Sequence, residues 1–303
     1  MTHSRYASIY TYPALVSQQL QKADTNSGDQ AIEDEFNDYF ALCKRYCRDY
    51  SKIIEERIGR TFVPYYASKD WYFADAIADY DLLHSQRRGT YMLNLREDLL
   101  VIDNVTWNGT ALTSTQYRVV DAGNNTFGYP YDRLLVDSSN TSYGTDFDDK
   151  ATIVGEWGVH DNATDSYATV SVLAEDLDTV ETAIDVANGQ GDLFEIFQYI
   201  RVNDELMLIT DIDSSGDPDV LTVERGVNGF TATTHTTGDT ITLWNVVKDV
   251  QELTTRMVAY YFNKRDDKGE KIQVIDDALV LAQFDTQLAQ IAERRKRSFM
   301  VVT

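Results

Sequence analysis

Apolar side chains recur every three or four residues in three parts of the chain, and this spacing is typical of amphipathic helices. The pattern predicts a first helix over residues 29–58 and two further helices over residues 246–265 and 276–297. In the first and third segments, acidic residues gather near the start and basic residues near the end, which suits the helix dipole. We expect these three helices to form a helical core.

Between the first and second helices, the apolar residues fall instead in short β-prone runs bounded by turns. The tight-turn pair Asn108-Gly109 follows one of these runs directly. We expect short strands at residues 70–73, 91–95, 99–107, 116–120, 133–137 and 151–157.

Residues 159–245 differ in composition from the rest of the chain. They contain no lysine and only two arginines, Arg201 and Arg225, and they are rich in Thr, Val, Asp and Gly. Short apolar runs separated by turns indicate a small all-β module. Its expected strands are residues 169–173, 182–186, 199–202, 205–210, 220–223 and 240–244.

These segments predict how the chain is organised into domains. Residues 1–28 have no sustained period and are expected to form an extended N-terminal arm. Residues 29–158 and 246–297 are expected to pack together as one core, with residues 159–245 as an inserted β domain and residues 298–303 as an apolar tail. The predicted fold class is α+β: a helical-bundle core, made of a long N-terminal helix and two C-terminal helices, with short strands and an inserted all-β domain.

Composition and charge narrow the classes of function. The chain has 303 residues, of which 43% are hydrophobic, so it can bury a sizeable core. Its formal net charge is −22, which argues against conventional DNA binding because proteins hold phosphate with Lys and Arg. An acidic wall still allows DNA to slide past without sticking. No run approaches the roughly 18 apolar residues of a membrane span, so no membrane partner is expected.

Candidate catalytic residues are sparse. His235 and Asp239, with a nearby Ser or Thr, are the nearest approach to a hydrolytic set. No Gly-x-Ser-x-Gly elbow accompanies them, and no neighbourhood supplies a nucleophile, a base and an orienting group together. A turn-capping role for His235 is favoured over catalysis, and we expect the protein not to be an enzyme.

Candidate metal and cofactor sites are also weak. Residues 211–219 begin like a calcium-binding EF-hand loop, but Thr222 stands where a bidentate glutamate is required. An acidic hairpin turn is favoured there, with a weak divalent-ion site as the alternative. Cys43 and Cys47 lie four residues apart without partners for a zinc site, which favours two buried thiols. No cofactor and no metal are predicted.

A resemblance to a known family rests on a turn after the first helix and on the positions of apolar residues along the chain. The first helix runs into Ile54–Pro64, which contains the corner Gly-Arg-Thr-Phe, and Gly155–Gly158 follows as a strand before the C-terminal helices. This arrangement resembles the head–tail connector proteins of tailed bacteriophages, also called adaptor or head-completion proteins. The resemblance covers residues 29–158 and 246–297. The insert departs from that pattern and resembles a small β module of several phage structural proteins, with marks that include Val223-Glu224-Arg225-Gly226.

The resemblance implies a structural adaptor subunit of a phage neck. Such subunits form a ring, typically twelvefold, between the portal and the tail components, and the ring surrounds the DNA channel. The implied partners are the portal protein, neighbouring copies of the chain, tail, tail-terminator or nozzle proteins, and DNA that passes without specific binding. The implied location is the neck of the virion, assembled in the host bacterial cytoplasm. The alternative is a tail-associated or decoration protein whose β insert binds capsid, fibre or a host glycan.

Three sets of residues are candidate contact sites on this reading. The basic run near the C-terminus is either a solvated helix end or a patch that binds an acidic partner or the DNA in the channel. The apolar tail after it is either a disordered end or a strand that adds to a sheet of the portal. The subunit-interface candidates are Tyr39, Tyr46, Tyr50, Tyr260 and Tyr261; the basic patch is Arg294, Arg295, Lys296 and Arg297; the portal-docking tail is Phe299, Met300, Val301 and Val302.

Overall fold

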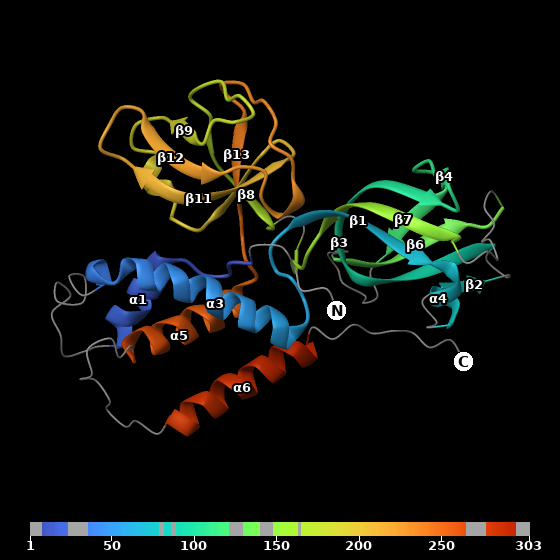
Figure 1. Ribbon diagram of the computed structural model, residues 1–303, viewed down its shortest axis with the longest axis horizontal. Helices are drawn as coiled ribbons and strands as arrows, with labels where there is room; N and C mark the ends of the chain where they lie inside the picture. The colour runs from blue at the N-terminus through green and yellow to red at the C-terminus, as the bar shows by residue number, and fades with distance from the viewer. Residues whose placement is uncertain are drawn as a thin grey trace. The chain divides into compact units, whose positions relative to one another are not determined.

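The computed structural model divides the chain into two compact units (Figure 1). The first unit comprises Met1–Val63 and Tyr167–Arg295, and the second comprises Pro64–Ser166 and Lys296–Thr303. The predicted grouping of residues 29–158 with residues 246–297 into one core stays a prediction. The structure describes residues 8–23, 36–78, 82–85, 89–120, 130–139, 148–162, 165–264 and 277–294.

Four α-helices of the first unit pack together within the described residues. They are α1 (Pro13–Ala23), α3 (Phe40–Ile58), α5 (Lys248–Asn263) and α6 (Asp277–Arg294). The three predicted helices are confirmed over the described parts of their ranges, and the predicted start of the first lies outside the described residues. Helix α3 ends at Gly59, whose left-handed φ of 73° lets its N–H bond to the carbonyl of Glu55 at 2.7 Å. None of the described helices is long and apolar enough to cross a membrane.

The predicted extended arm is wrong for residues 13–23, which form α1. Val16 and Leu20 lie one turn apart on this helix and are buried, and the segment before it buries Tyr10, whose N–H donates to the Ser51 hydroxyl at 2.8 Å. The apolar stripe of α1 is too short to give a sustained period in the sequence. Helix α1 contacts α3 and α5, and tertiary packing of this kind stabilises a helix that is marginal alone.

The first unit also contains a six-stranded antiparallel sheet in the order β8-β13-β10-β11-β12-β9. Each of its strands overlaps one predicted for the β module. The sheet encloses an apolar core that includes Ile184, Ile200, Met207 and Leu221. The strands are β8 (Tyr167–Val172), β9 (Ala183–Val186), β10 (Tyr199–Val202), β11 (Glu205–Asp213), β12 (Asp219–Glu224) and β13 (Thr240–Trp244).

Direct contacts join this module to the helices of the same unit. The indole N–H of Trp244, at the end of β13, donates to the carbonyl of Phe62 at 3.0 Å. The guanidinium of Arg48 on α3 lies 4.7 Å from the ring centre of Phe197, in the module. The helices and the module are therefore linked by side chains as well as by the chain itself.

The second unit is built on a seven-stranded antiparallel sheet in the order β1-β7-β3-β6-β5, with β2 and β4 also paired to β3. Trp107 and Trp157 are fully buried in this unit. The strands are β1 (Tyr65–Tyr72), β2 (Leu82–Ser85), β3 (Thr90–Trp107), β4 (Thr110–Ala111), β5 (Tyr117–Val120), β6 (Tyr131–Asp137) and β7 (Lys150–Trp157), and one short helix is α4 (Phe73–Ala78).

The predicted α+β class is confirmed, but a helical bundle with short strands is wrong. Strands predominate, and β3 alone runs for 18 residues through the two strands predicted at 91–95 and 99–107. Its pairing with β6 shifts register between Asn94 and Leu99, and from Leu99 onward it pairs with β7. The polar residues in that gap interrupt the two-residue alternation, so the sequence pattern indicates two strands where the backbone bulges and continues.

Candidate interaction surface

Four of the five candidate tyrosines come together as a continuous ladder of rings across the helices. Tyr46 meets Tyr50 edge to face at 5.8 Å between ring centres, and Tyr50 stacks on Tyr261 at 4.5 Å with an interplanar angle of 14°. Tyr261 meets Tyr260 at 5.2 Å, and Tyr260 meets Phe284 of α6 at 5.7 Å. We call these five residues the aromatic ladder.

The tyrosines of the aromatic ladder are half-buried, so their rings contact protein on one side and solvent on the other. Cations lie beside two of its rings: the Arg45 guanidinium lies 5.5 Å from the Tyr46 ring centre, and the Lys264 ammonium lies 4.9 Å from that of Tyr260. Partial burial raises the pKa of the Tyr50 phenol, and the neighbouring Tyr261 phenol raises it further. The phenol keeps its proton for hydrogen bonding at neutral pH, as a tyrosine with the ordinary pKa also does.

Exposed aliphatic side chains continue this surface on α3 and α6. Ile53 follows Tyr46 and Tyr50 at helical spacing on α3 and is 39% exposed. Leu281 on α6 is also 39% exposed, one turn before Phe284. The guanidinium of Arg57, one turn after Ile53 on α3, lies 3.9 Å from the carboxylate of Asp285 on α6. The side of α3 that carries Ile53 therefore faces α6.

Tyr39, the fifth candidate, lies at the N-cap of α3 and is half-buried. It precedes Tyr46 by seven residues, which places it about 10 Å away along the helix axis. The structure therefore gathers four of the predicted interface residues and places the fifth about two turns away.

A buried charge network occupies one end of the β module. The carboxylate of Glu205, which is fully buried, accepts two bonds from the Arg225 guanidinium, at 2.6 and 2.7 Å. It also accepts the backbone N–H of Gly226 and of Thr233, each at 3.0 Å. Burial raises the pKa of Glu205, but these bonds, led by those of Arg225, outweigh it and hold the pKa below the ordinary value. We call this set, with His235, the Glu205 network.

His235 belongs to this network and is closed off from solvent. Its side chain is fully buried, with Nε2 2.9 Å from a Glu205 oxygen. Since an ionised carboxylate only accepts hydrogen bonds, Nε2 carries the proton. The predicted turn-capping role of His235 is wrong: the Asp239 carboxylate caps that turn, accepting the N–H of Thr236 at 2.9 Å.

The acidic residues 211–219 form the β11–β12 hairpin, as favoured from the sequence. The Asp213 carboxylate accepts the backbone N–H of Ser215 at 2.9 Å, and that of Asp219 accepts the N–H of Gly191 at 2.7 Å. One oxygen of each of these two carboxylates is thus used by the chain itself. In the part of the chain that the structure describes, no three His, Cys, Asp or Glu side chains are placed to hold a metal ion.

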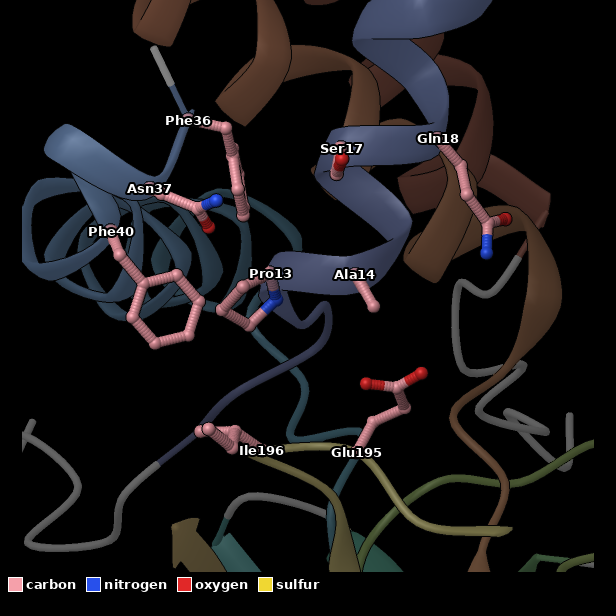
Figure 2. A pocket seen from close by; sticks show the side chains of 9 residues that line it. All are labelled: Pro13, Ala14, Ser17, Gln18, Phe36, Asn37, Phe40, Glu195 and Ile196. Atoms are coloured by element: carbon pink, nitrogen blue, oxygen red, sulfur yellow. The ribbon is translucent and has the colours of Figure 1, made fainter. Parts of the chain in front are cut away.

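A cavity of about 400 Å³ lies between the helices and the β module of the first unit (Figure 2). Figure 2 shows the Glu195 carboxylate directed from a module loop toward Ala14 on α1, with the rings of Phe36 and Phe40 to one side. The sequence gives no signal for this site, because its walls come from three separated segments. The lining residues are Pro13, Ala14, Ser17, Gln18, Phe36, Asn37, Phe40, Glu195 and Ile196, and we call this site the Glu195 pocket.

The other two predicted contact sites lie almost wholly beyond the described part of the chain. Arg294 is the last residue of α6. The rest of the basic patch, Arg295 to Arg297, and the docking tail, Phe299 to Val302, lie outside the described residues and stay predictions. Comparison with known proteins gives no matching family model and no curated protein whose sequence matches this chain.

Proposed function

We propose that this chain is a structural head–tail adaptor of a tailed bacteriophage, which forms a ring between the portal and the tail. The observation that supports this proposal most is the aromatic ladder. Protein interfaces are enriched in Tyr and Arg at their centres, where half-exposed rings offer large contact areas at small entropic cost. The ladder and its flanking Arg45 combine these features on one helical surface.

A closed ring requires each subunit to present one face to a different face of its neighbour. We propose that the aromatic ladder, with Ile53 and Leu281, is one of these two faces. Burial of both aliphatic side chains against a neighbour removes apolar surface from water and stabilises the ring. Chemistry at Glu205 and His235 is not part of the proposal, since both side chains are sealed inside the module.

The acidic balance of the chain fits a channel for DNA. With a net charge of −22, a ring of many copies repels phosphate over most of its surface. DNA then passes through the ring without specific binding. The portal, the tail or nozzle proteins and neighbouring copies are the proposed partners, in the neck of the virion.

The test is to mix the purified full chain with portal-bearing capsids and to image the vertex by electron microscopy. A ring of density beneath the portal is expected. A variant with Tyr50→Ala and Tyr261→Ala removes the stacked pair of the ladder and should leave portals bare or with incomplete rings. Complete rings from this variant would refute the ladder as the subunit contact, and bare portals with the folded wild-type chain would refute the adaptor role.

A tail-associated or decoration protein is the second candidate, and the β module supports it. Val180 is 78% exposed at the tip of a turn in which the Asp178 carboxylate accepts the N–H of Val180 and of Glu181. Arg225 of the Glu205 network donates to the carbonyls of Asp178 and Glu181, so the turn is held in place before any partner arrives. Attachment of the chain to fibres or capsid shells, but not to portals, would favour this candidate.

A further inference from the structure

We infer that residues 8–12 are a latch that fixes the orientation of the β module on the helices, and that release of this latch lets the module turn while both parts stay folded. The inference goes beyond the proposed function, because it concerns motion within one subunit and holds for a free chain as well as for a ring. The latch lies directly before α1 and has no regular secondary structure. Its residues Ser8 to Thr11 are nevertheless buried.

The latch is hydrogen-bonded to the helices mainly through Tyr10. The backbone N–H of Tyr10 donates to the Ser51 hydroxyl on α3 at 2.8 Å, and its phenol donates to the Glu55 carboxylate at 3.0 Å. The same phenol accepts the backbone N–H of Phe62 at 3.3 Å, and the rings of Tyr10 and Phe62 meet edge to face at 5.5 Å. One side chain thus ties the latch both to α3 and to the segment that follows it.

The latch also reaches the β module. Burial raises the pKa of the Tyr199 phenol on β10, and a hydrogen bond with the backbone of Ile9 opposes this shift. Burial likewise raises the pKa of the Tyr12 phenol, and a hydrogen bond with the Gln198 side chain opposes it. The latch therefore lies between the helices and the module and bonds to both.

The seam between the helices and the module is loosely packed beside the latch. The Glu195 pocket, of about 400 Å³, lies between α1 and a loop of the module (Figure 2). A second cavity of about 120 Å³ is lined by residues 9–12, 197–199, 243–246 and 251. Protein interiors hold few voids of this size, so the two parts gain less packing energy across the seam than a closed core would give. Within the first unit, the chain joins the module to the helices at residues 245–247, between β13 and α5.

Each part has a core of its own and can keep its fold when the latch opens. The module encloses an apolar core that includes Ile200 and Met207. The helices pack on one another, with the rings of Phe36 and Phe262 5.7 Å apart. Loss of the latch therefore removes bonds that fix the angle between the two parts and leaves both cores intact.

The first experiment measures residual dipolar couplings of backbone amides in the deuterated full chain. In the wild type, the couplings of the helices and of the module should fit one alignment tensor. Tyr10→Ala should require two tensors, with that of the module reduced by motion, and Tyr10→Phe, which keeps the ring, should stay closer to the wild type. Val16→Ala is the control, because it truncates a fully buried side chain on α1 and destabilises the helices without touching the latch bonds. One tensor for a folded Tyr10→Ala variant, or two tensors for the wild type or for Val16→Ala, would overturn the inference.

The second experiment uses two neighbouring threonines of α5, and it decides the inference even if Tyr10→Ala does not fold. The hydroxyls of Thr254 and Thr255 each donate to the carbonyl four residues earlier, at 2.7 and 2.8 Å. That of Thr255 also lies 2.6 Å from the Thr11 hydroxyl of the latch. Thr255→Val should speed hydrogen exchange of the Tyr10 amide about tenfold, since the latch loses one buried hydrogen bond, whereas Thr254→Val should leave the rate unchanged. Equal exchange rates in the two variants would refute the latch.

Discussion

The aromatic ladder and the Glu205 network use polar side chains in opposite ways within the same compact unit. The ladder keeps uncharged phenols half-exposed on helices, with each ring packed on the next. The network takes three ionisable side chains, those of Glu205, Arg225 and His235, almost wholly out of water and gives the carboxylate five donors. Desolvated charges of this kind are costly unless every partner is present. The network therefore serves the fold of the module, whereas the half-exposed side of the ladder is the surface that we propose for contact with another molecule.

The largest effect on stability is expected from Glu205→Gln. The substitution keeps the shape but removes the charge opposite Arg225, and it turns an amide N–H toward groups that are themselves donors. Breaking a buried ion pair costs about 3–5 kcal/mol, and the free energy of unfolding should fall by that amount in urea denaturation. Asp204→Asn is the matched control, since the fully exposed side chain of Asp204 makes only a long contact with Arg201 at 3.4 Å. If both variants unfold at the same urea concentration, the network does not stabilise the module.

His235→Ala should have the next largest effect. It removes one of the five donors to Glu205 and leaves the other four in place. A hydrogen bond to a charged group contributes about 1.5–3 kcal/mol, and the loss in the free energy of unfolding should lie in that range. Assembly of the variant into particles at a temperature where it stays folded should be unchanged. Loss of particle function without loss of stability would instead favour a chemical role for His235.

The pH dependence of the free energy of unfolding should depend on the ionisation of the Glu205 carboxyl group. Burial raises the pKa of Glu205 in the folded chain, but hydrogen bonds from Arg225, the backbone and His235 outweigh it and hold the pKa below its ordinary value of 4.5. A carboxyl group whose pKa is lower in the folded state stabilises the fold above its unfolded pKa, and this contribution is lost as the pH falls through the folded pKa. The wild type should therefore lose stability below about pH 4.5 more steeply than Glu205→Gln in denaturation series at stepped pH. Parallel curves for the two proteins would contradict this origin of the pH dependence.

The sequence predicted the elements whose pattern is local and missed features that depend on partners far along the chain. Helix α5 and strands β10 and β13 follow clear periods and were predicted closely. Helix α1 was missed because only Val16 and Leu20 mark its buried face, and packing on α3 and α5 supplies the rest of its stability. Strand β3 was divided in two because its bulge interrupts the alternation.

The same holds for the candidate sites: local spacing predicted which residues take part, and contacts between distant parts of the chain were not predicted. Tyr39, Tyr46, Tyr50, Tyr260 and Tyr261 were predicted as one set of interface candidates, and the structure gathers all of them except Tyr39. The stacking of Tyr50 on Tyr261 joins residues more than 200 positions apart, and no sequence period reports it. The sequence predicted no role for Glu205, because its donors come from separate turns of the module.

The smallest effect on folding, and the largest on assembly, is expected from Tyr50→Ala. The half-buried ring contributes its stacking on Tyr261, which is worth about 0.5–1.5 kcal/mol beyond the area it buries. The free energy of unfolding should therefore fall by far less than in Glu205→Gln, while the occupancy of rings on portal-bearing capsids drops sharply. Tyr50→Phe is the matched control, because it keeps the stacked ring and removes only the hydroxyl group; it should assemble nearly as the wild type does. A Tyr50→Ala variant that unfolds as readily as Glu205→Gln would show that the ladder, like the network, belongs to the core, and the contrast between the two regions would then be lost.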